Sequence, residues 1–315
     1  MNVCFVGVGS IARRHIKNLI FVCKKRLIDL QIDAFRTQNT ENIEGITNIY
    51  TNIKNIPNYY DVIFITNPTS LHLDTLELFH DKGKNFFIEK PVVSLDKIKI
   101  AKNFRLKKGV IYYVACPLRY NPVIQWIKQN INIDDVFSVR SICSSYLPEW
   151  RIGQDYTKSY SAHKDMGGGV SIDLIHEWDY ITYLFGFPEK VSCFIGKKSN
   201  LEINSDDYAI YIAEYKNKIA ELHLDYFGRK TIREICLLMK EDTITGDIAN
   251  NQIKFLKAGK IIDFNEDRDD YQKRELNNFL DIILGHKNIS HEYDFFHALK
   301  VLELTQGIIQ NENFC

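Results

Sequence analysis

The sequence lacks a long apolar run, an excess of charge of either sign and paired cysteines. Lys plus Arg and Asp plus Glu each number 40, so the formal net charge is zero. No domain-scale basic field is therefore available to hold nucleic acid or a membrane surface. No stretch approaches the ~18 uncharged apolar residues of a membrane span. The first apolar segment, Val3–Val8, is short and has no basic segment before it, so we expect no secretory signal.

The seven cysteines are scattered along the chain and form no Cys-x-x-Cys pair. Their number is odd, and several lie within apolar runs, where a free cysteine behaves as a small hydrophobic residue. We therefore expect no disulfide framework, no metal site and a reducing, cytoplasmic environment.

The first third of the chain alternates between two patterns. Apolar, strand-like segments cover 2–6, 31–35, 61–66, 85–88 and 110–115, and segments of helical spacing cover 10–26, 70–82 and 95–108. This alternation predicts an α/β fold with a doubly wound parallel sheet of the Rossmann type.

After Pro117 the pattern changes. Strand-like segments with alternating polarity cover 136–146, 191–196, 208–215, 219–226, 232–239 and 253–264; helical segments cover 122–129, 169–185, 271–284 and 293–310. Such alternation indicates an open, mostly antiparallel sheet with one solvated face. A length of 315 residues suits two domains, and we predict a nucleotide-binding domain over 1–118 and an α+β domain over 119–315.

A glycine-rich loop, Gly7-Val8-Gly9-Ser10-Ile11-Ala12, joins the first strand to the first helix. The first glycine permits the tight turn, the second lets the backbone approach a pyrophosphate, and the small third residue, Ala12, allows close packing. The pyrophosphate meets the helix N-terminus. We predict that Gly7, Gly9, Ser10, Ile11 and Ala12 bind a dinucleotide; the alternative is a glycine-rich turn without a ligand.

The end of the second strand distinguishes NADP from NAD. An acid there would bind the ribose 2′-hydroxyl, and an arginine would pair with a 2′-phosphate. Arg36 and Thr37 occupy that place, and Asp33 lies two residues too early. We favour NADP, although Arg36 as an ordinary surface residue, or stacked on the adenine of NAD, stays open.

Several motifs occur in a fixed order: the loop Gly7–Ala12 with Arg14-His15, the segment Thr66–His72, Glu89-Lys90-Pro91, and a triple glycine at 167–169 leading to Asp173 and His176. In this order the chain resembles the glucose–fructose oxidoreductase and inositol dehydrogenase (Gfo/Idh/MocA) family over essentially its whole length. The resemblance implies an NAD(P)-dependent oxidoreductase that acts on the hydroxyl or keto group of a sugar, sugar phosphate or nucleotide sugar.

Further cofactor contacts are expected where the next two strands end, since parallel sheets bind ligands at that edge. We assign Thr66, Asn67, Pro68 and His72 to the first of these positions, with helix N-terminal packing as the alternative for His72. Glu89 and Lys90 follow the next strand. The resemblance also suggests a bend at Pro91, and a cis peptide there is a hypothesis.

Asp173 and His176 are three residues apart on a predicted helix, so they share a face. A histidine near a carboxylate is a suitable acid/base. Many family members place these residues four apart, which leaves open whether Asp173, His176 or Glu177 moves the proton. The resemblance implies that Lys90 hydrogen-bonds the reacting oxygen, so we predict Lys90, Asp173 and His176 as catalytic residues.

The segments 146–151 and 155–164 are rich in aromatic, basic and hydroxyl side chains, which suit a polyhydroxylated ring. Arg151, Lys158 and Lys164 are candidates to hold a phosphate or carboxylate. The alternative is a solvated loop over a sheet edge. The predicted substrate-binding residues are Arg119, Tyr146, Trp150, Arg151, Tyr160 and His163.

The segment 146–164 also resembles the subset of the family associated with bacterial surface-sugar pathways. Two other functions stay open: a redox-neutral, NAD-dependent glycosidase, and a non-catalytic dinucleotide sensor. The open sheet has a face to cover, so we expect a homodimer or homotetramer, and neither nucleic acid nor a membrane as a partner.

Overall fold

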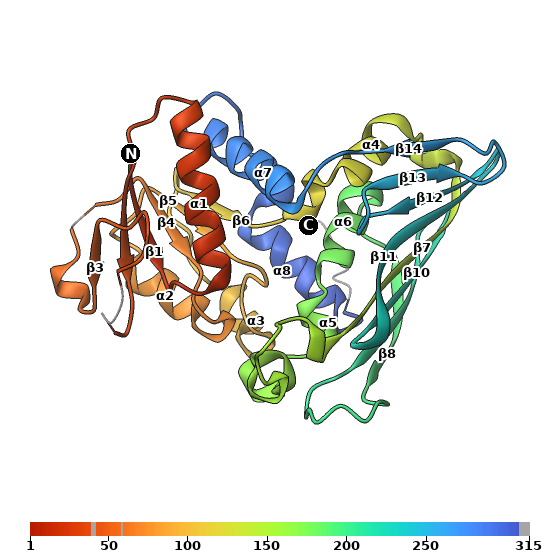
Figure 1. The fold of residues 1–315 in the computed structure, drawn as a ribbon, viewed down its shortest axis with the longest axis horizontal. Helices are drawn as coiled ribbons and strands as arrows, with labels where there is room; N and C mark the ends of the chain where they lie inside the picture. The colour runs from red at the N-terminus through yellow and green to blue at the C-terminus, as the bar shows by residue number, and fades with distance from the viewer. Residues whose placement is uncertain (39–41, 58, 309–315) are drawn as a thin grey trace. The chain divides into compact units, whose positions relative to one another are not determined.

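The computed structural model describes residues 1–38, 42–57 and 59–308 (Figure 1). The chain forms two compact units. Unit 1 comprises Met1–Pro117 and Arg268–Leu299; unit 2 comprises Leu118–Asp267 and the described residues from Lys300 onward. None of the helices in these described ranges is long and apolar enough to cross a membrane.

Unit 1 contains a six-stranded parallel sheet in the order β3-β2-β1-β4-β5-β6, which is the strand order of dinucleotide-binding folds. The central strands are apolar throughout because both faces of the sheet are covered. Its strands are β1 (Asn2–Val6), β2 (Gln31–Phe35), β3 (Asn48–Tyr50), β4 (Val62–Ile65), β5 (Asn85–Ile88) and β6 (Ile111–Val114). The predicted Rossmann fold is confirmed, with the short β3 as an addition.

The α-helices of unit 1 are α1 (Ser10–Lys25), α2 (His72–Leu78), α3 (Ile98–Ala101) and α7 (Arg268–Ile283). The predicted helices over 70–82 and 95–108 were too long. Each segment opens with a 3-10 turn, at Thr69–Leu71 and Leu95–Lys97, and then forms a short α-helix. The spacing of apolar residues predicts that a helical segment exists but does not define the residues at which it begins and ends.

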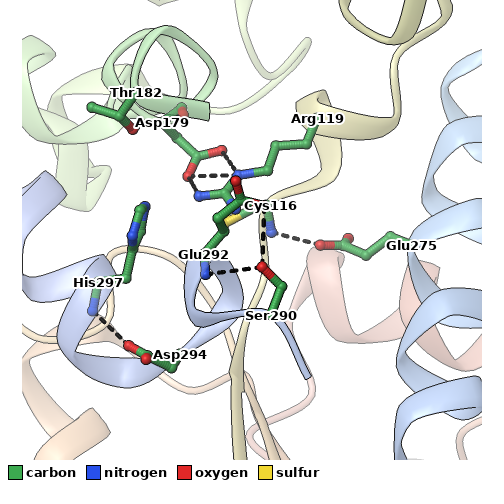
Figure 2. Close-up of polar contacts among 9 residues, drawn as sticks. All are labelled: Cys116, Arg119, Asp179, Thr182, Glu275, Ser290, Glu292, Asp294 and His297. Carbon is green, nitrogen blue, oxygen red and sulfur yellow. Dashed lines mark hydrogen bonds and ion pairs between the residues drawn. The ribbon is translucent and has the colours of Figure 1, made fainter. Parts of the chain in front are cut away.

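Helix α7 packs on the sheet of unit 1, although the sequence places it far from those strands. The ring of Phe279 lies 5.2 Å from the rings of Phe87 and Tyr113. Glu275 accepts a hydrogen bond from the backbone N–H of Cys116 at 2.5 Å (Figure 2). Residues 268–299 therefore pack with unit 1, whereas the predicted division assigned them to 119–315. The division of cofactor and substrate roles between the two ranges stays a proposal.

Unit 2 contains an eight-stranded sheet in the order β14-β13-β12-β11-β7-β10-β9-β8. Only β10 and β7 run parallel; the other neighbours are antiparallel. Its strands are β7 (Val136–Tyr146), β8 (Lys190–Gly196), β9 (Tyr208–Glu214), β10 (Ile219–Asp225), β11 (Phe227–Met239), β12 (Thr243–Asp247), β13 (Gln252–Phe255) and β14 (Ile261–Asp263). The predicted strand over 253–264 is a hairpin whose turn contains Gly259 at φ +69°.

One face of this sheet is covered by helices. The ring of Trp178 packs edge-on against Tyr211 at 5.2 Å, and the hydroxyls of Tyr180 and Ser141 lie 2.6 Å apart. These helices are α4 (Pro122–Asn130), α5 (Val170–Asp173) and α6 (His176–Phe185). The last helix, α8 (Phe295–Leu304), begins in unit 1 and ends in unit 2; the helix predicted through Gln310 extends beyond the described residues.

The other face of the sheet is open. The register places Ile142, His223, Ile210 and Phe194 in one row across four strands. Ile142 and Phe194 are 39% and 68% exposed. Exposed apolar side chains on a solvated sheet face form a surface that another chain can cover.

Candidate active site

The glycine loop has different structural requirements at its two glycines. Gly7 adopts φ +83°, and a Cβ atom there would lie 2.6 Å from the Cα atom of Asn67. Gly9 adopts φ −84°, which any residue tolerates, and a Cβ atom there would meet nothing within 4 Å. Folding of the described chain therefore requires glycine at position 7 but not at position 9. The open space at Gly9 fits a ligand that approaches the backbone closely.

The N-terminus of α1 is available to an anion. This 16-residue helix has no side-chain cap and no acidic residue in its first turn. Gly9 and Ser10 are exposed, and Ala12 is fully buried. The first amide groups of a helix need partners from outside the helix, and a pyrophosphate supplies them. The local structure fits the predicted dinucleotide.

Arg36 follows β2, as predicted, and its backbone is fixed by a hydrogen bond to the carbonyl oxygen of Tyr50 at 3.0 Å. One guanidinium nitrogen, Nη1, is buried and has no hydrogen-bond partner among the described residues. Asp33 is used structurally, because it accepts hydrogen bonds from Asn48 at 2.9 Å and Tyr60 at 2.8 Å. Arg36 is thus the charged side chain at this strand end that lacks a complete set of partners.

The segment after β4 packs against the glycine loop. The Thr66 hydroxyl donates to the carbonyl oxygen of Gly7 at 2.7 Å. Asn67 donates from Nδ2 to Thr75 at 2.7 Å, and its Oδ1 is buried with no partner in the described chain. Position 67 therefore offers an acceptor to a ligand, whereas Thr66 stabilises the loop.

His72 connects two loops of unit 1. It is 1% exposed, and its ring nitrogens lie 3.0 Å from the carbonyl oxygens of Asn67 and Pro91. Burial lowers the pKa of His72 in spite of these hydrogen bonds. These contacts favour the packing alternative for His72, because both nitrogens are already engaged by the backbone.

Glu89 holds the segment that carries Lys90. Its carboxylate lies 2.5 Å from Nε2 of His15, which is itself 1% exposed, and it accepts a hydrogen bond from the Lys90 N–H at 3.2 Å. The Lys90–Pro91 peptide is cis, as the hypothesis expected. Burial acts to raise the pKa of Glu89, but the hydrogen bond and charge of His15 outweigh it, so the pKa lies below its ordinary value. Glu89 is thereby suited to position Lys90.

The lowered pKa of Glu89 predicts an acid-dependent stability. An ionised Glu89 stabilises the fold above the ordinary carboxyl pKa, and this contribution is lost as the pH falls through the lower pKa of the folded state. The loss in unfolding free energy caused by Glu89→Gln should therefore be larger at pH 7 than at about pH 3.5. Denaturant unfolding at both pH values measures it, with the exposed Glu189→Gln as control. An equal loss at both would contradict this role.

The segment with Asp173 and His176 is not one continuous helix, so the predicted helix over 169–185 was wrong in this respect. Helix α5 ends at Asp173, Leu174 and Ile175 form a turn, and α6 begins at His176. Leu174 adopts φ −96° and ψ 29°, outside the regular helix. The three-residue spacing therefore places the two side chains at adjoining helix ends instead of on one helical face.

Asp173 lies among tyrosine side chains of unit 2. The Tyr226 hydroxyl donates to its carboxylate at 2.5 Å, and Tyr226 is fully buried. The negative charge of Asp173, followed by burial, raises the pKa of Tyr160. The sequence offered no signal for Tyr226, because an apolar strand ending in tyrosine is an ordinary core pattern.

The two other acid/base candidates differ in their surroundings. Glu177 is fully buried, and its Oε1 lies 2.7 Å from Nε of Arg233 on β11. His176 is partly exposed at the start of α6. Because an ion pair inside unit 2 engages Glu177, the structure favours Asp173 and His176 over Glu177 for proton transfer.

The predicted substrate loop surrounds a cavity of about 380 Å³ within unit 2. Trp150 and Arg151 line it, and Arg151 lies over the ring of Tyr160, 5.6 Å from the centroid. His163 donates from Nε2 to the carbonyl oxygen of Thr157 at 2.7 Å. Tyr146 is covered by Arg229 at 3.8 Å. Trp150 and Arg151 are thus placed to meet a ligand, Tyr160 supports Arg151 from behind, and His163 and Tyr146 make contacts that support the loop.

Arg119 is one of the predicted substrate-binding residues. It is fully buried, and its guanidinium donates to the Asp179 carboxylate at 2.6 Å from Nη2 and 3.0 Å from Nε (Figure 2). A buried arginine paired through two nitrogens stabilises the contact between its own segment and α6. These contacts favour a structural role for Arg119, and its predicted part in substrate binding stays a prediction.

Comparison with known proteins identifies two matching family models. Residues 1–116 match the oxidoreductase family with an NAD-binding Rossmann fold, named GFO_IDH_MocA. Residues 125–233 match the GFO/IDH/MocA C-terminal domain. The two models are parts of one family architecture and follow one another along the chain.

Two curated relatives come from Bacillus subtilis (strain 168). An uncharacterised oxidoreductase, YrbE, is 26% identical over 187 residues, which are 58% of this chain and 52% of the relative. A scyllo-inositol 2-dehydrogenase (NAD(+)) is 30% identical over 128 residues, or 40% of this chain and 35% of the relative. The chain thus matches about half or less of the length of these relatives.

A solved structure extends the similarity of fold. Levoglucosan dehydrogenase in complex with NADH superimposes with a TM-score of 0.83, covering 98% of this chain and 95% of that chain. The sequences are 16% identical, so this likeness supports the fold alone.

Proposed function

Because the chain belongs to the Gfo/Idh/MocA family of oxidoreductases, we propose that it moves a hydride between a nicotinamide cofactor and a hydroxyl or keto group of a sugar-type substrate. The meeting of α5 and α6 carries this proposal. Helix α5 ends at Asp173, whose carboxylate accepts a hydrogen bond from the Tyr226 hydroxyl at 2.5 Å. Helix α6 begins at the partly exposed His176. A carboxylate and an imidazole at adjoining helix ends can handle the proton of an alcohol.

Each side chain has a distinct part in the proposed reaction. The nicotinamide, when bound, supplies or accepts the hydride. His176 takes up the hydroxyl proton as the alcohol is oxidised and returns it in the reverse direction. Asp173 favours the protonated imidazole, and Tyr226 holds the Asp173 carboxylate in place. Lys90 donates a hydrogen bond to the reacting oxygen, where negative charge develops.

A polyhydroxylated ring is the proposed class of substrate. The relatives include enzymes named for scyllo-inositol and levoglucosan. In this chain Trp150 and Tyr156 offer aromatic surfaces to the cavity, and Ser159 and Ser161 line it as well. We extend the proposal to bacterial surface-sugar metabolism on the resemblance of the segment 146–164.

One experiment tests the function directly. The purified protein is analysed for a co-purifying dinucleotide, and reduced nicotinamide is then followed against sugars, sugar phosphates and nucleotide sugars. Net reduction or oxidation with one of these classes supports the proposal. Glycoside cleavage without net change in the cofactor would indicate the redox-neutral alternative. Binding without turnover of any kind would indicate a sensor, and failure to bind either dinucleotide would contradict all three.

We propose NADP as the preferred cofactor on account of the buried Nη1 of Arg36, which has no hydrogen-bond partner within the described ranges of the chain. A 2′-phosphate would supply the missing acceptor, and a hydrogen bond between charged groups is worth about 10–100-fold in affinity. Arg36→Ala should therefore weaken NADPH binding by that factor and leave NADH nearly unchanged, as measured by nicotinamide fluorescence titration. Lys24→Ala, an exposed change on α1, is the control. If Arg36→Ala weakened the binding of NADPH and NADH equally, the NADP assignment would be wrong.

We also propose that the chain forms a homodimer or homotetramer through the open face of the eight-stranded sheet. The row of Ile142, His223, Ile210 and Phe194 across four strands supports this, because its two ends, Ile142 and Phe194, are exposed apolar side chains. Covering such a row removes apolar surface from water.

A further inference from the structure

The cavity of about 380 Å³ is formed by one continuous part of unit 2, between Leu147 and Ser161. Its wall combines the aromatic side chains of Trp150 and Tyr156 with the charged side chains of Arg151, Asp155 and Lys158. This volume is in the range of small-molecule sites, and mixed walls of this kind are typical of them. The charges on the wall indicate which chemical group it accepts.

Two of the three charged side chains neutralise each other. Asp155 accepts hydrogen bonds from the backbone N–H of Thr157 at 3.0 Å and from its hydroxyl at 2.6 Å, and Lys158 lies 3.5 Å from the same carboxylate. These hydrogen bonds, with the nearby charge of Lys158, lower the pKa of Asp155. The charge of the Asp155 carboxylate is therefore already used by Thr157 of its own turn and by Lys158.

Arg151 is the remaining charge on the wall. It is exposed and forms no ion pair with any residue that the structure describes. Its guanidinium lies over the ring of Tyr160, 5.6 Å from the centroid. A cation–π contact orients the planar guanidinium but leaves its N–H groups free to bind an anion. The cavity therefore has one oriented, uncompensated positive charge.

Tyr160 connects Arg151 to the proposed catalytic residue Asp173. One face of its ring carries Arg151, and the negative charge of Asp173 raises the pKa of its hydroxyl. The triple glycine permits this approach, because a Cβ atom at Gly168 would lie 2.0 Å from the carbonyl oxygen of Tyr160. Arg151 and Asp173 thus both act on the side chain of Tyr160.

We propose that Arg151 binds an anionic group of the substrate, a carboxylate or a phosphate, and that the substrate is an acidic or phosphorylated sugar. This inference rests on the proposed function for the role of Asp173. The planar guanidinium donates two parallel hydrogen bonds to either anion. Tyr160 orients that guanidinium, so little side-chain freedom is lost on binding.

Isothermal titration of the whole protein with three probes tests the proposal: D-glucose, D-glucuronate and D-glucose 6-phosphate. We expect one or both charged sugars to bind at least about 10-fold more tightly than glucose. Arg151→Gln should weaken that binding by about 10–100-fold. The control Lys190→Gln, an exposed cation outside the cavity that pairs with Glu214 at 3.3 Å, should change it by less than about 3-fold. The more tightly bound probe identifies the anion.

Two outcomes would overturn the inference: equal affinity for the neutral and both charged sugars, or equal effects of Arg151→Gln and Lys190→Gln. Thermal unfolding of both variants verifies that each retains its fold. The titration needs no turnover, so its result is separate from the redox assay. Binding through Arg151 without cofactor turnover would count against the proposed function alone. Turnover of neutral sugars that Arg151→Gln leaves unchanged would count against this inference alone.

Discussion

Replacing His176 or Lys90 with alanine should lower kcat by about 10²–10⁴-fold while the dissociation constant for the cofactor stays nearly constant. His176 begins α6 beside the end of α5, and the Lys90 backbone is fixed by Glu89. Their loss removes the proton acceptor or the donor to the reacting oxygen without changing the glycine loop. Steady-state rates with the best sugar, together with fluorescence titration of the cofactor, measure the two effects separately.

The matched controls are His80→Ala and Lys84→Ala. His80 lies after α2, and Lys84 pairs with Asp61 at 2.9 Å near the opposite end of β5. Both controls should keep kcat within about 2-fold, since neither residue is near the sheet edge that binds ligands. A loss of rate in the controls as large as in the two variants would remove the catalytic assignment. So would full activity of His176→Ala.

Gly9→Ala and Gly7→Ala should separate cofactor binding from folding. A Cβ atom at Gly9 meets nothing within 4 Å, and the φ of −84° suits alanine, so the unfolding temperature should not fall. The same Cβ would occupy space needed by a pyrophosphate, and we expect dinucleotide affinity to fall by at least about 10-fold. Thermal unfolding and fluorescence titration measure the two properties.

Gly7→Ala should instead affect mainly the stability of the fold. Alanine there combines a φ of +83° with a Cβ atom 2.6 Å from the backbone of Asn67. These strains should lower the free energy of unfolding by about 1–3 kcal/mol, whether or not the cofactor is present. If Gly9→Ala bound the dinucleotide as tightly as the unaltered chain, the loop would be a turn without a ligand.

Much of the fold could be predicted because its signals are local. The bounds of β1, β2, β5 and β7 match the predicted segments to the residue, since each is an apolar or alternating run of defined length. The break between α5 and α6 could not be predicted, because its residues have ordinary helical spacing. Nor could the packing of α7 on unit 1, which depends on contacts of Phe279 with strands far away in sequence.

The candidate site likewise combines features that local sequence predicts with features that depend on contacts between distant residues. The sequence by itself determined the strand–glycine–helix segment, because neighbouring residues define that motif, and its resemblance to the family led to the prediction of Lys90, Asp173 and His176 as catalytic residues. Only the tertiary structure decided which charged groups are available. It pairs Arg119 with Asp179 and Glu177 with Arg233, and leaves Arg151 unpaired among the described residues. A buried charge needs a partner, and that partner comes from whichever distant element the fold brings beside it.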